Sequence, residues 1–241
     1  MFRGKLRRGK VEFNNPRDAS TLRNRGFRGK NMGEGLSLDI YSSLYLAAKG
    51  RAVIYDREGI ITPGDLKGKL NVNDLLKFYA FKFLRDKGFD PKVERGRIFA
   101  GREKALILPY DGLLDVKKLM GTGYVVVVDS EGECILYRNQ KFIFPKGRPV
   151  PGVEGSGGSD EVLDYFRGRS LTLKSGSKYG SDYRVYDGTV SHARYLLSIS
   201  EKIPVKDLVA RVRVANSVRK IYVHGYGRKR YVFYAISWIN V

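Results

Sequence analysis

The C-terminal third of the sequence holds a tyrosine, a histidine and a lysine, each in a short polar motif. They are Tyr186 in K-Y-G-S-D-Y-R-V-Y, His192 in S-H-A-R-Y and Lys220 at the end of R-V-A-N-S-V-R-K. A histidine exchanges a proton near neutral pH, and a lysine ammonium favours the charged form of a neighbouring phenol. The three side chains therefore suit proton transfer beside a stabilised negative charge, provided that the fold brings them together.

The elements that would position these side chains can be predicted from local patterns. Alternating residues predict a strand over 179–186 that ends in an Asp-Gly turn, and a second strand through 195–199. The segment 211–220 is ambiguous, because its β-branched alternation suits a strand while its apolar residues also share one helical face. As a helix it would set Arg213 and Lys220 two turns apart on one side.

The three motifs, in this order, resemble those of the archaeal tRNA-splicing endonucleases, also called tRNA-intron lyases. That family has a Gly-rich K-[FY]-G-x-D-[FY]-R-V-Y strand, a histidine that opens the next strand, and an R-V-A-x-S-V-R-K helix. Three linked motifs are far more specific than one short match. The resemblance favours a helix for the ambiguous segment.

The resemblance also implies a reaction and a role for each residue. RNA carries its own nucleophile, the 2′-hydroxyl, so cleavage needs only a base, an acid and a cation to stabilise the phosphorane. By resemblance these are Tyr186, His192 and Lys220 respectively. The implied products are a 2′,3′-cyclic phosphate and a 5′-hydroxyl, formed without a metal or another cofactor.

Two further residues are implied to hold the RNA. In the family, a pair of planar cationic or aromatic side chains sandwiches a flipped-out bulge base. Arg213 occupies the first position, and Trp238 replaces the usual arginine at the second while still offering a stacking plane. Without the resemblance, a lone tryptophan is expected in the core.

Each catalytic candidate also has an ordinary structural interpretation. Tyr186 alone would be a half-buried strand residue, and Lys220 would be a solvated lysine at a helix end. His192 taken alone is as often structural as functional, and His224, which lies outside any motif, is expected to be structural. The aspartates near the tyrosine, at 182 and 187, do not form a two-metal cluster, which argues against a magnesium-dependent nuclease.

Composition is compatible with an RNA-binding protein. The 241 residues include 45 Lys+Arg against 25 Asp+Glu, a formal charge of +20. Such an excess favours a polyanionic partner, nucleic acid first, although a basic thermophile protein or a ribosomal component would also fit. The single cysteine, Cys134, excludes an intramolecular disulfide and fits a reducing compartment, so a cytoplasmic location is expected. No apolar run approaches membrane-spanning length.

The chain is predicted to be an α+β protein with an N-terminal domain and two copies of a small mixed-sheet nuclease-like domain. Residues 1–70 form the N-terminal domain, which begins with a basic hairpin. Residues 71–145 are interpreted as a degenerate copy of the catalytic domain, in which Ala-Leu-Ile-Leu at 105–108 and Tyr-Asp-Gly at 110–112 stand where the catalytic strand should be. A Pro- and then Gly/Ser-rich linker over 146–159 precedes the catalytic copy, 160–241.

Two helices are predicted before the linker. Ser37 is expected to cap a helix from Leu38 to Lys49 that Gly50 ends. A second helix is expected to begin at Asn73 and to end before Gly88.

The closing hairpins of the two copies differ in charge at their turns. The first turn, D-S-E-G-E, contributes Asp129, Glu131 and Glu133, whereas the second, G-Y-G-R-K-R, is basic. The resembling family docks an acidic loop of a non-catalytic unit into a basic pocket on a catalytic unit. Because this chain contains both kinds of unit, the resemblance implies a reciprocal homodimer with two active sites. An ordinary solvated turn is the alternative.

Together these features predict an endoribonuclease that cleaves precursor tRNA at exon–intron junctions. The competing hypothesis is a non-catalytic structural subunit or RNA-binding protein of the same fold. All three catalytic positions of the resembling family are filled here, which favours the enzyme.

Overall fold

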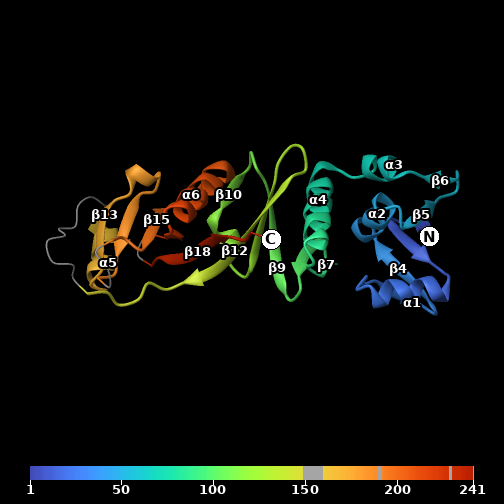
Figure 1. The fold of residues 1–241 in the computed structure, drawn as a ribbon, viewed down its shortest axis with the longest axis horizontal. Coiled ribbons are helices and arrows are strands. Elements are labelled where there is room, and N and C mark those ends of the chain that lie inside the picture. The colour runs from blue at the N-terminus through green and yellow to red at the C-terminus, as the bar shows by residue number, and fades with distance from the viewer. Residues whose placement is uncertain (149–159, 189–191, 228–229, 241) are drawn as a thin grey trace. The chain divides into compact units, whose positions relative to one another are not determined.

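The structure is a computed structural model that describes residues 1–148, 160–188, 192–227 and 230–240. It divides into two compact units, Met1–Arg102 and Glu103–Val241 (Figure 1). The first unit thus extends beyond the N-terminal domain predicted to end at residue 70. Most of the predicted linker, residues 149–159, lies outside the described residues.

The first unit is built on a six-stranded sheet with the order β3-β4-β2-β1-β5-β6. The strands are β1 (Phe2–Arg7), β2 (Lys10–Phe13), β3 (Lys30–Met32), β4 (Gly35–Asp39), β5 (Ala52–Tyr55) and β6 (Ile60–Ile61). The predicted basic hairpin is confirmed as β1 and β2, which pair antiparallel. Gly4 permits this pairing to pack tightly, because a Cβ at that position would lie 2.4 Å from Cγ1 of Val11.

Helices cover only one face of this sheet. α1 (Pro16–Asn24) begins at Asn15, whose side chain accepts from two backbone amides, and α2 (Ile40–Ala48) begins at Asp39 in the same way. The predicted cap, Ser37, is wrong, since Ser37 lies within β4 and the carboxylate two residues later caps the helix instead. The predicted stop at Gly50 is confirmed by its left-handed backbone, φ 65°.

The rest of the first unit consists of α3 (Pro63–Gly68), α4 (Val72–Asp86) and the hairpin β7 (Pro91–Glu94) and β8 (Arg97–Ala100). The second predicted helix is therefore confirmed, but Asn71 rather than Asn73 caps it. Two carboxylates of α4 bind tyrosines of α2: Tyr41 Oη donates to Asp74 at 2.7 Å and Tyr45 Oη to Asp86 at 3.0 Å. These bonds hold α4 against the N-terminal sheet domain.

The second unit has a sheet whose strands follow the order β13-β14-β15-β17-β18-β12-β11-β9. The strands are β9 (Glu103–Pro109), β11 (Tyr124–Val128), β12 (Cys134–Phe142), β13 (Thr172–Ser175), β14 (Tyr183–Tyr186), β15 (Tyr195–Ile199), β17 (Ile221–Tyr226) and β18 (Val232–Trp238). Two short strands, β10 (Leu113–Asp115) and β16 (Lys202–Pro204), pair separately. The helices are α5 (Asp160–Arg167) and α6 (Val205–Ser217), with the 3₁₀ turns η1 (Val116–Leu119) and η2 (Ser177–Tyr179). The helical prediction for the ambiguous segment is confirmed up to Ser217.

The two halves of this unit have the same order of strand pairings. β9 runs parallel to β11, which forms a hairpin with β12, just as β15 runs parallel to β17, which forms a hairpin with β18. The halves meet antiparallel through β12 with β18 and β10 with β16. The closing hairpins therefore pair within the chain, which covers strand edges that would otherwise be exposed.

This topology corrects one sequence-based equivalence. Tyr110 follows β9, and the pairing pattern makes β9 the counterpart of β15, not of the strand that carries Tyr186. The motif Y-D-G does not distinguish the two strands, because it is short and occurs at both 110–112 and 186–188. In place of the long helix α6, the first half has only the 3₁₀ turn η1.

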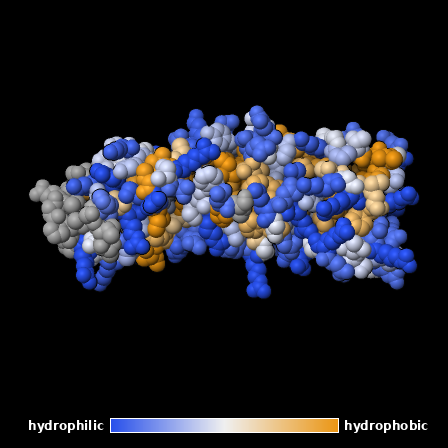
Figure 2. Space-filling view, viewed as in Figure 1, coloured by the Kyte–Doolittle hydropathy of each residue, from blue (hydrophilic) through white to orange (hydrophobic). Residues whose placement is uncertain are grey.

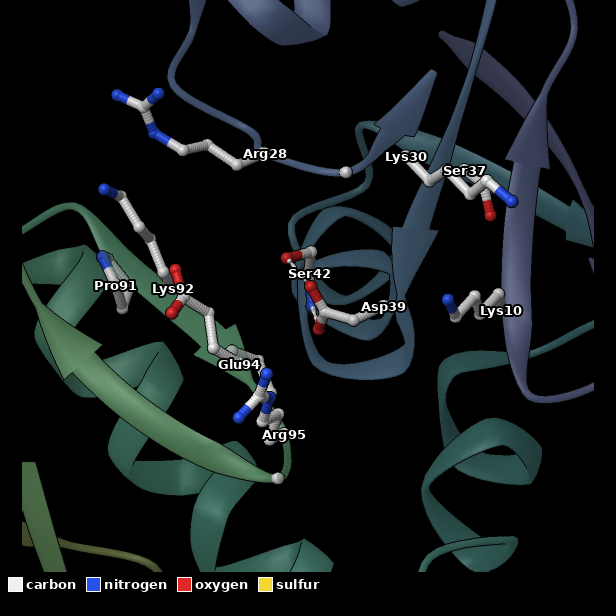
Figure 3. A pocket seen from close by; sticks show the side chains of 13 residues that line it. Lys10, Arg28, Lys30, Ser37, Asp39, Ser42, Pro91, Lys92, Glu94 and Arg95 are labelled. Carbon is white, nitrogen blue, oxygen red and sulfur yellow. Dashed lines mark hydrogen bonds between the residues drawn. The ribbon is translucent and has the colours of Figure 1, made fainter. Parts of the chain in front are cut away.

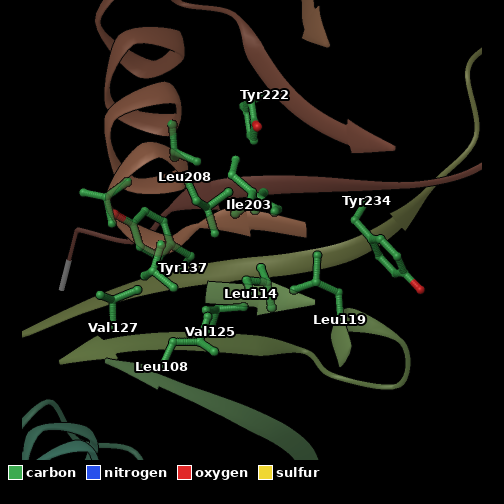
Figure 4. Close-up of a cluster of buried hydrophobic side chains, with 14 of the residues drawn as sticks. Leu108, Leu114, Leu119, Val125, Val127, Tyr137, Ile203, Leu208, Tyr222 and Tyr234 are labelled. Atoms are coloured by element: carbon green, nitrogen blue, oxygen red, sulfur yellow. The ribbon is translucent and has the colours of Figure 1, made fainter. Parts of the chain in front are cut away.

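Two apolar clusters hold the second unit together, one on each face of the sheet. The larger lies beneath α6 and joins both halves (Figure 4), with Val125 and Val127 from the first and Leu208, Val212 and Tyr222 from the second. The other lies beneath α5 and contains Phe166, Val185 and Phe233. The predicted α+β class is confirmed. Among the residues that the structure describes, no helix is long and apolar enough to cross a membrane.

Candidate active site

One end of the central sheet brings the predicted catalytic positions together. Val185 of β14 pairs with Tyr195 of β15, which in turn pairs with Ile221 of β17. Tyr186 and Lys220 are each one residue beyond these pairs and so reach the same end of the sheet. Because adjacent strands are about 4.8 Å apart, their backbones are about 10 Å apart across β15.

Tyr186 points to the α6 side of the sheet. Arg184 pairs with Leu196, a member of the cluster beneath α6, and paired residues share a face. Tyr186 lies two residues after Arg184 and therefore shares that face. It is 8% exposed, which leaves its ring packed at the edge of the core. The strand that carries it is shorter than predicted, because residues 177–179 form η2 and Gly180 adopts φ 67°.

Lys220 is placed by the end of α6, not by the helix itself. The helix ends at Ser217, so Lys220 does not lie two turns from Arg213 on a continuous helix as expected. Instead, Lys220 N donates to Ala215 O at 2.8 Å and Arg219 N to Asn216 O at 3.1 Å, the pattern of a Schellman motif. Arg219 takes the left-handed position with φ 54°, a conformation that usually favours glycine.

The ammonium of Lys220 donates to the backbone carbonyl of Ala193 at 2.5 Å. Ala193 directly follows His192, so this bond fixes the lysine beside the histidine's own segment. His192 is exposed and stands just before β15, immediately after residues 189–191, which lie outside the described residues. The segments that carry the three predicted catalytic residues thus lie at one end of the sheet, and His192 is exposed there.

Two further residues lie at this end of the sheet, and the sequence motifs did not predict a functional role for either. Asp187, next to Tyr186, is only 2% exposed, and its Oδ2 lies 3.4 Å from Nη1 of Arg194. Arg194 stands between Tyr186 and Lys220 in the same row across the sheet, and its side chain is about half exposed. The sequence offered only weak signals for them, since an Asp before Gly is usual turn chemistry.

Arg213 and Trp238 are both exposed, on α6 and at the end of β18. Trp238 is 42% exposed, so its interpretation as a core residue is wrong. Trp238 pairs with Tyr137 of β12. Burial raises the pKa of Tyr137 to about 12, and the positive charge of the Arg213 guanidinium lowers the same pKa. Arg213 and Trp238 therefore both lie near Tyr137. Trp238 also lies two residues beyond Ile236, which pairs with Tyr222, so it reaches the same sheet end as Lys220.

His224 is confirmed as a structural histidine. It has no exposed surface, and burial lowers its pKa to about 4, so the ring is neutral at physiological pH. Its Nδ1 lies 2.9 Å from the hydroxyl of Tyr222, and its Nε2 lies 3.2 Å from the carbonyl oxygen of Ser200. These distances fit a neutral ring that accepts from the tyrosine and donates to the carbonyl.

The acidic turn, defined by Asp129, Glu131 and Glu133, joins β11 to β12. Asp129 Oδ1 accepts from the backbone amides of both glutamates at 2.9 Å, which fixes the turn. The two glutamate side chains are exposed, and within the described part of the chain they form no ion pair. Of the basic turn in the second half, Arg228 and Lys229 lie outside the described residues.

Comparison with known families matches both ends of the chain. Residues 161–232, which contain Tyr186, His192 and Lys220, match the catalytic C-terminal domain of tRNA intron endonucleases. Residues 2–67 match the N-terminal domain of the same enzymes. The chain belongs to the tRNA intron endonuclease family. It is therefore an endoribonuclease, and the matched segments include every strand that places Tyr186, His192 and Lys220.

Several curated relatives are named tRNA-splicing endonucleases. That of Thermoplasma volcanium is 29% identical, over 77% of this chain and 80% of its own length. That of Pyrococcus abyssi is 29% identical, over 60% of this chain and 92% of its own length. The protein of Methanococcus maripaludis reaches 45% identity, but over only 22% of this chain and 34% of its own.

Proposed function

We propose that this family member cleaves precursor tRNA at exon–intron junctions, within a bulge-helix-bulge, by attack of the RNA's own 2′-hydroxyl. The observation that carries the proposal is that the segments of Tyr186, His192 and Lys220 lie at one end of three adjacent strands, with Lys220 bonded to the residue after His192. The relatives' name, tRNA-splicing endonuclease, supports the choice of substrate.

In this mechanism Tyr186, as phenolate, takes the proton of the 2′-hydroxyl. The 2′-oxygen then attacks the adjacent phosphorus, and the bond between phosphorus and the 5′-oxygen breaks. His192 donates a proton to that leaving oxygen, and the ammonium of Lys220 stabilises the charge of the phosphorane. The products are a 2′,3′-cyclic phosphate and a 5′-hydroxyl, and no metal is needed because the nucleophile belongs to the substrate.

Arg213 and Trp238 are proposed to bind a bulge base. Both present a planar group to solvent, and an unstacked base can stack on either plane. Their exposure supports this role, because a nucleobase could not stack on a buried side chain.

We also propose that residues 71–145 are a degenerate copy of the catalytic domain and that two chains form a homodimer. The shared order of pairings in the two halves supports the repeat. The unpaired glutamates of the acidic turn support docking onto a basic surface of a second chain.

The decisive experiment incubates the protein with an intron-containing transcript in excess EDTA. We expect cleavage at both junctions, with ends that an enzyme specific for 2′,3′-cyclic phosphates recognises. A protein that binds the transcript without cutting it would instead be a non-catalytic member of the fold. Cleavage only after magnesium is restored would contradict the proposed chemistry.

A further inference from the structure

The sheet of the first unit has one face without helices, and that face is basic. Residues that pair directly point to the same side, so the pairings Lys5–Glu12, Glu12–Ser37 and Lys30–Ser37 define one row of it. The pairing of Arg7 with Lys10 defines the next row. The opposite face carries Val11, Phe13, Leu36 and Leu38, all buried beneath α1 and α2.

Five cations lie on the open face, which we call the basic face: Arg3, Lys5, Arg7, Lys10 and Lys30. All five are exposed, and the three on β1 alternate, so they follow one another at about 7 Å along the strand. Hydrophilic residues dominate the surface seen in Figure 2. Such a row suits a polyanion with regularly spaced charges.

The few acids on the basic face are already engaged. Glu12 lies 3.6 Å from Arg7. Asp39 caps α2, accepting from the amides of Tyr41 and Ser42 at 2.9 and 3.0 Å. In the described part of the chain, Arg3, Lys5, Lys10 and Lys30 form no ion pair. Their charges are therefore free to bind an external anion.

A cleft of about 640 Å³ continues the basic face toward the β7–β8 hairpin. Figure 3 shows Lys10 on one wall and Lys92, Glu94 and Arg95 on the other, with Asp39 between them, so cations outnumber carboxylates among these side chains. Arg95 and Gly96 form the two-residue turn of the hairpin, both with positive φ (49° and 72°). This tight turn places Arg95 at the cleft that it lines.

The base of the hairpin is tied to the sheet domain by charged contacts. Arg85 of α4 donates to Asp90 at 3.0 Å and to the carbonyl of Gly26 at 3.3 Å, and Arg28 lies 3.4 Å from Asp90. The two walls of the cleft are thus joined by bonds within the first unit. The cleft is a preformed part of the surface.

We propose that the basic face and its cleft bind phosphates of the precursor RNA other than the phosphate at the cleaved bond. This inference rests on the proposed function, which supplies the polyanion. It assigns to the N-terminal unit a part in substrate affinity, separate from the chemistry at the sheet end that carries Lys220. Contacts to phosphates carry no sequence information, so this surface would add affinity without changing the cleavage position.

The test uses the full-length protein with Arg3→Gln and Lys5→Gln combined. The matched control combines Arg17→Gln and Lys87→Gln, which remove the same charge from α1 and the end of α4, away from the open face. Binding of an intron-containing precursor transcript is measured over a range of salt concentrations, and thermal unfolding confirms that both variants are folded.

Each lost phosphate contact lowers the slope of log K against log salt by about 0.7–0.9. We therefore expect the slope of the test variant to fall by about 1.4–1.8, and affinity near 0.2 M salt to fall about tenfold. The control should retain the wild-type slope. Equal losses in both variants, or none in the test variant, would overturn the inference.

A short duplex that contains only the two bulges and their connecting helix separates this inference from the proposed function. If the wild-type protein cuts that duplex, the proposed cleavage function is supported, whether or not the basic face binds RNA. If it cuts neither substrate, the function itself fails. If it cuts both but the test variant binds the precursor with wild-type salt dependence, only the basic face is wrong.

Discussion

Acidification from pH 7 to pH 4.5 should destabilise the second unit because His224 must remain neutral in the folded state. Burial lowers its pKa to about 4, against an ordinary value of 6.5. The unfolded chain therefore binds a proton between these values that the folded chain does not, so stability falls as the pH falls through this window. The nearby Arg211 guanidinium also lowers the pKa, whereas the Ser200 carbonyl and Asp182 raise it.

The size of the effect follows from the difference between the two pKa values. A gap of about 2.5 units corresponds to about 3 kcal/mol, of which about 2.5 kcal/mol is lost by pH 4.5. Ion pairs and hydrogen bonds lower the pKa values of Asp74 and Asp86 from 3.8 and that of Glu103 from 4.5. These carboxylates therefore reduce the stability of the folded state mainly below pH 4.5. The window above pH 4.5 thus reports mainly on the histidine.

The assay is urea unfolding at a series of pH values, followed by tryptophan fluorescence. The only tryptophan, Trp238, lies in the second unit and reports on its unfolding. His224→Gln is the control, because glutamine can both donate and accept but does not titrate. Its unfolding free energy should be nearly constant from pH 6.5 to 4.5, even if it is lower throughout. Parallel pH profiles for the two proteins would refute the assignment of the proton to His224.

Four further outcomes are expected. His192→Ala should lower cleavage by about two orders of magnitude or more while RNA binding persists, since only general acid catalysis is lost; cleavage at the wild-type rate would remove His192 from the site. Arg213→Ala and Trp238→Ala should each weaken RNA engagement by about 1–3 kcal/mol in binding titrations, with Trp238→Phe close to wild type; unfolding without a specific RNA defect would count against base stacking. Arg219→Gly should raise stability by about 1 kcal/mol in urea unfolding, because glycine adopts φ 54° without strain, and a lower midpoint would argue against strain there. Replacing the three carboxylates of the acidic turn with serine should give folded, inactive monomers in size-exclusion chromatography, whereas an active dimer would make the turn ordinary surface.

Local sequence predicted the elements better than their ends. Helix α2 has cap-forming side chains at both Ser37 and Asp39, and the pairing of β4 with β2, which extends as far as Asp39, decides between them. Similarly, α4 could begin at Asn71 or Asn73, and either asparagine satisfies the local rule. Competing caps within a few residues cannot be ranked without the tertiary contacts.

The residues of the candidate site that lie in motifs could be predicted from the sequence. The residues that reach the site only through strand pairing could not. Tyr186 and Lys220 were found by their motifs, but the place of Arg194 between them depends on pairings between distant segments. The exposure of Trp238 follows from its place at the end of β18, which sequence alone does not reveal. The homodimer, the bounds of the repeat and the cytoplasmic location stay predictions.

The single long helix α6 serves both halves of the second unit, since its Leu208 and Val212 share one buried cluster with Val125 and Val127 of the first half. The same helix ends in the turn that sets Lys220. The half that lacks the proposed catalytic side chains thus packs against the helix whose end places Lys220. Substitutions in the first half can therefore shift Lys220 through α6 and reduce activity without touching RNA, so their effects should not be additive with substitutions in α6.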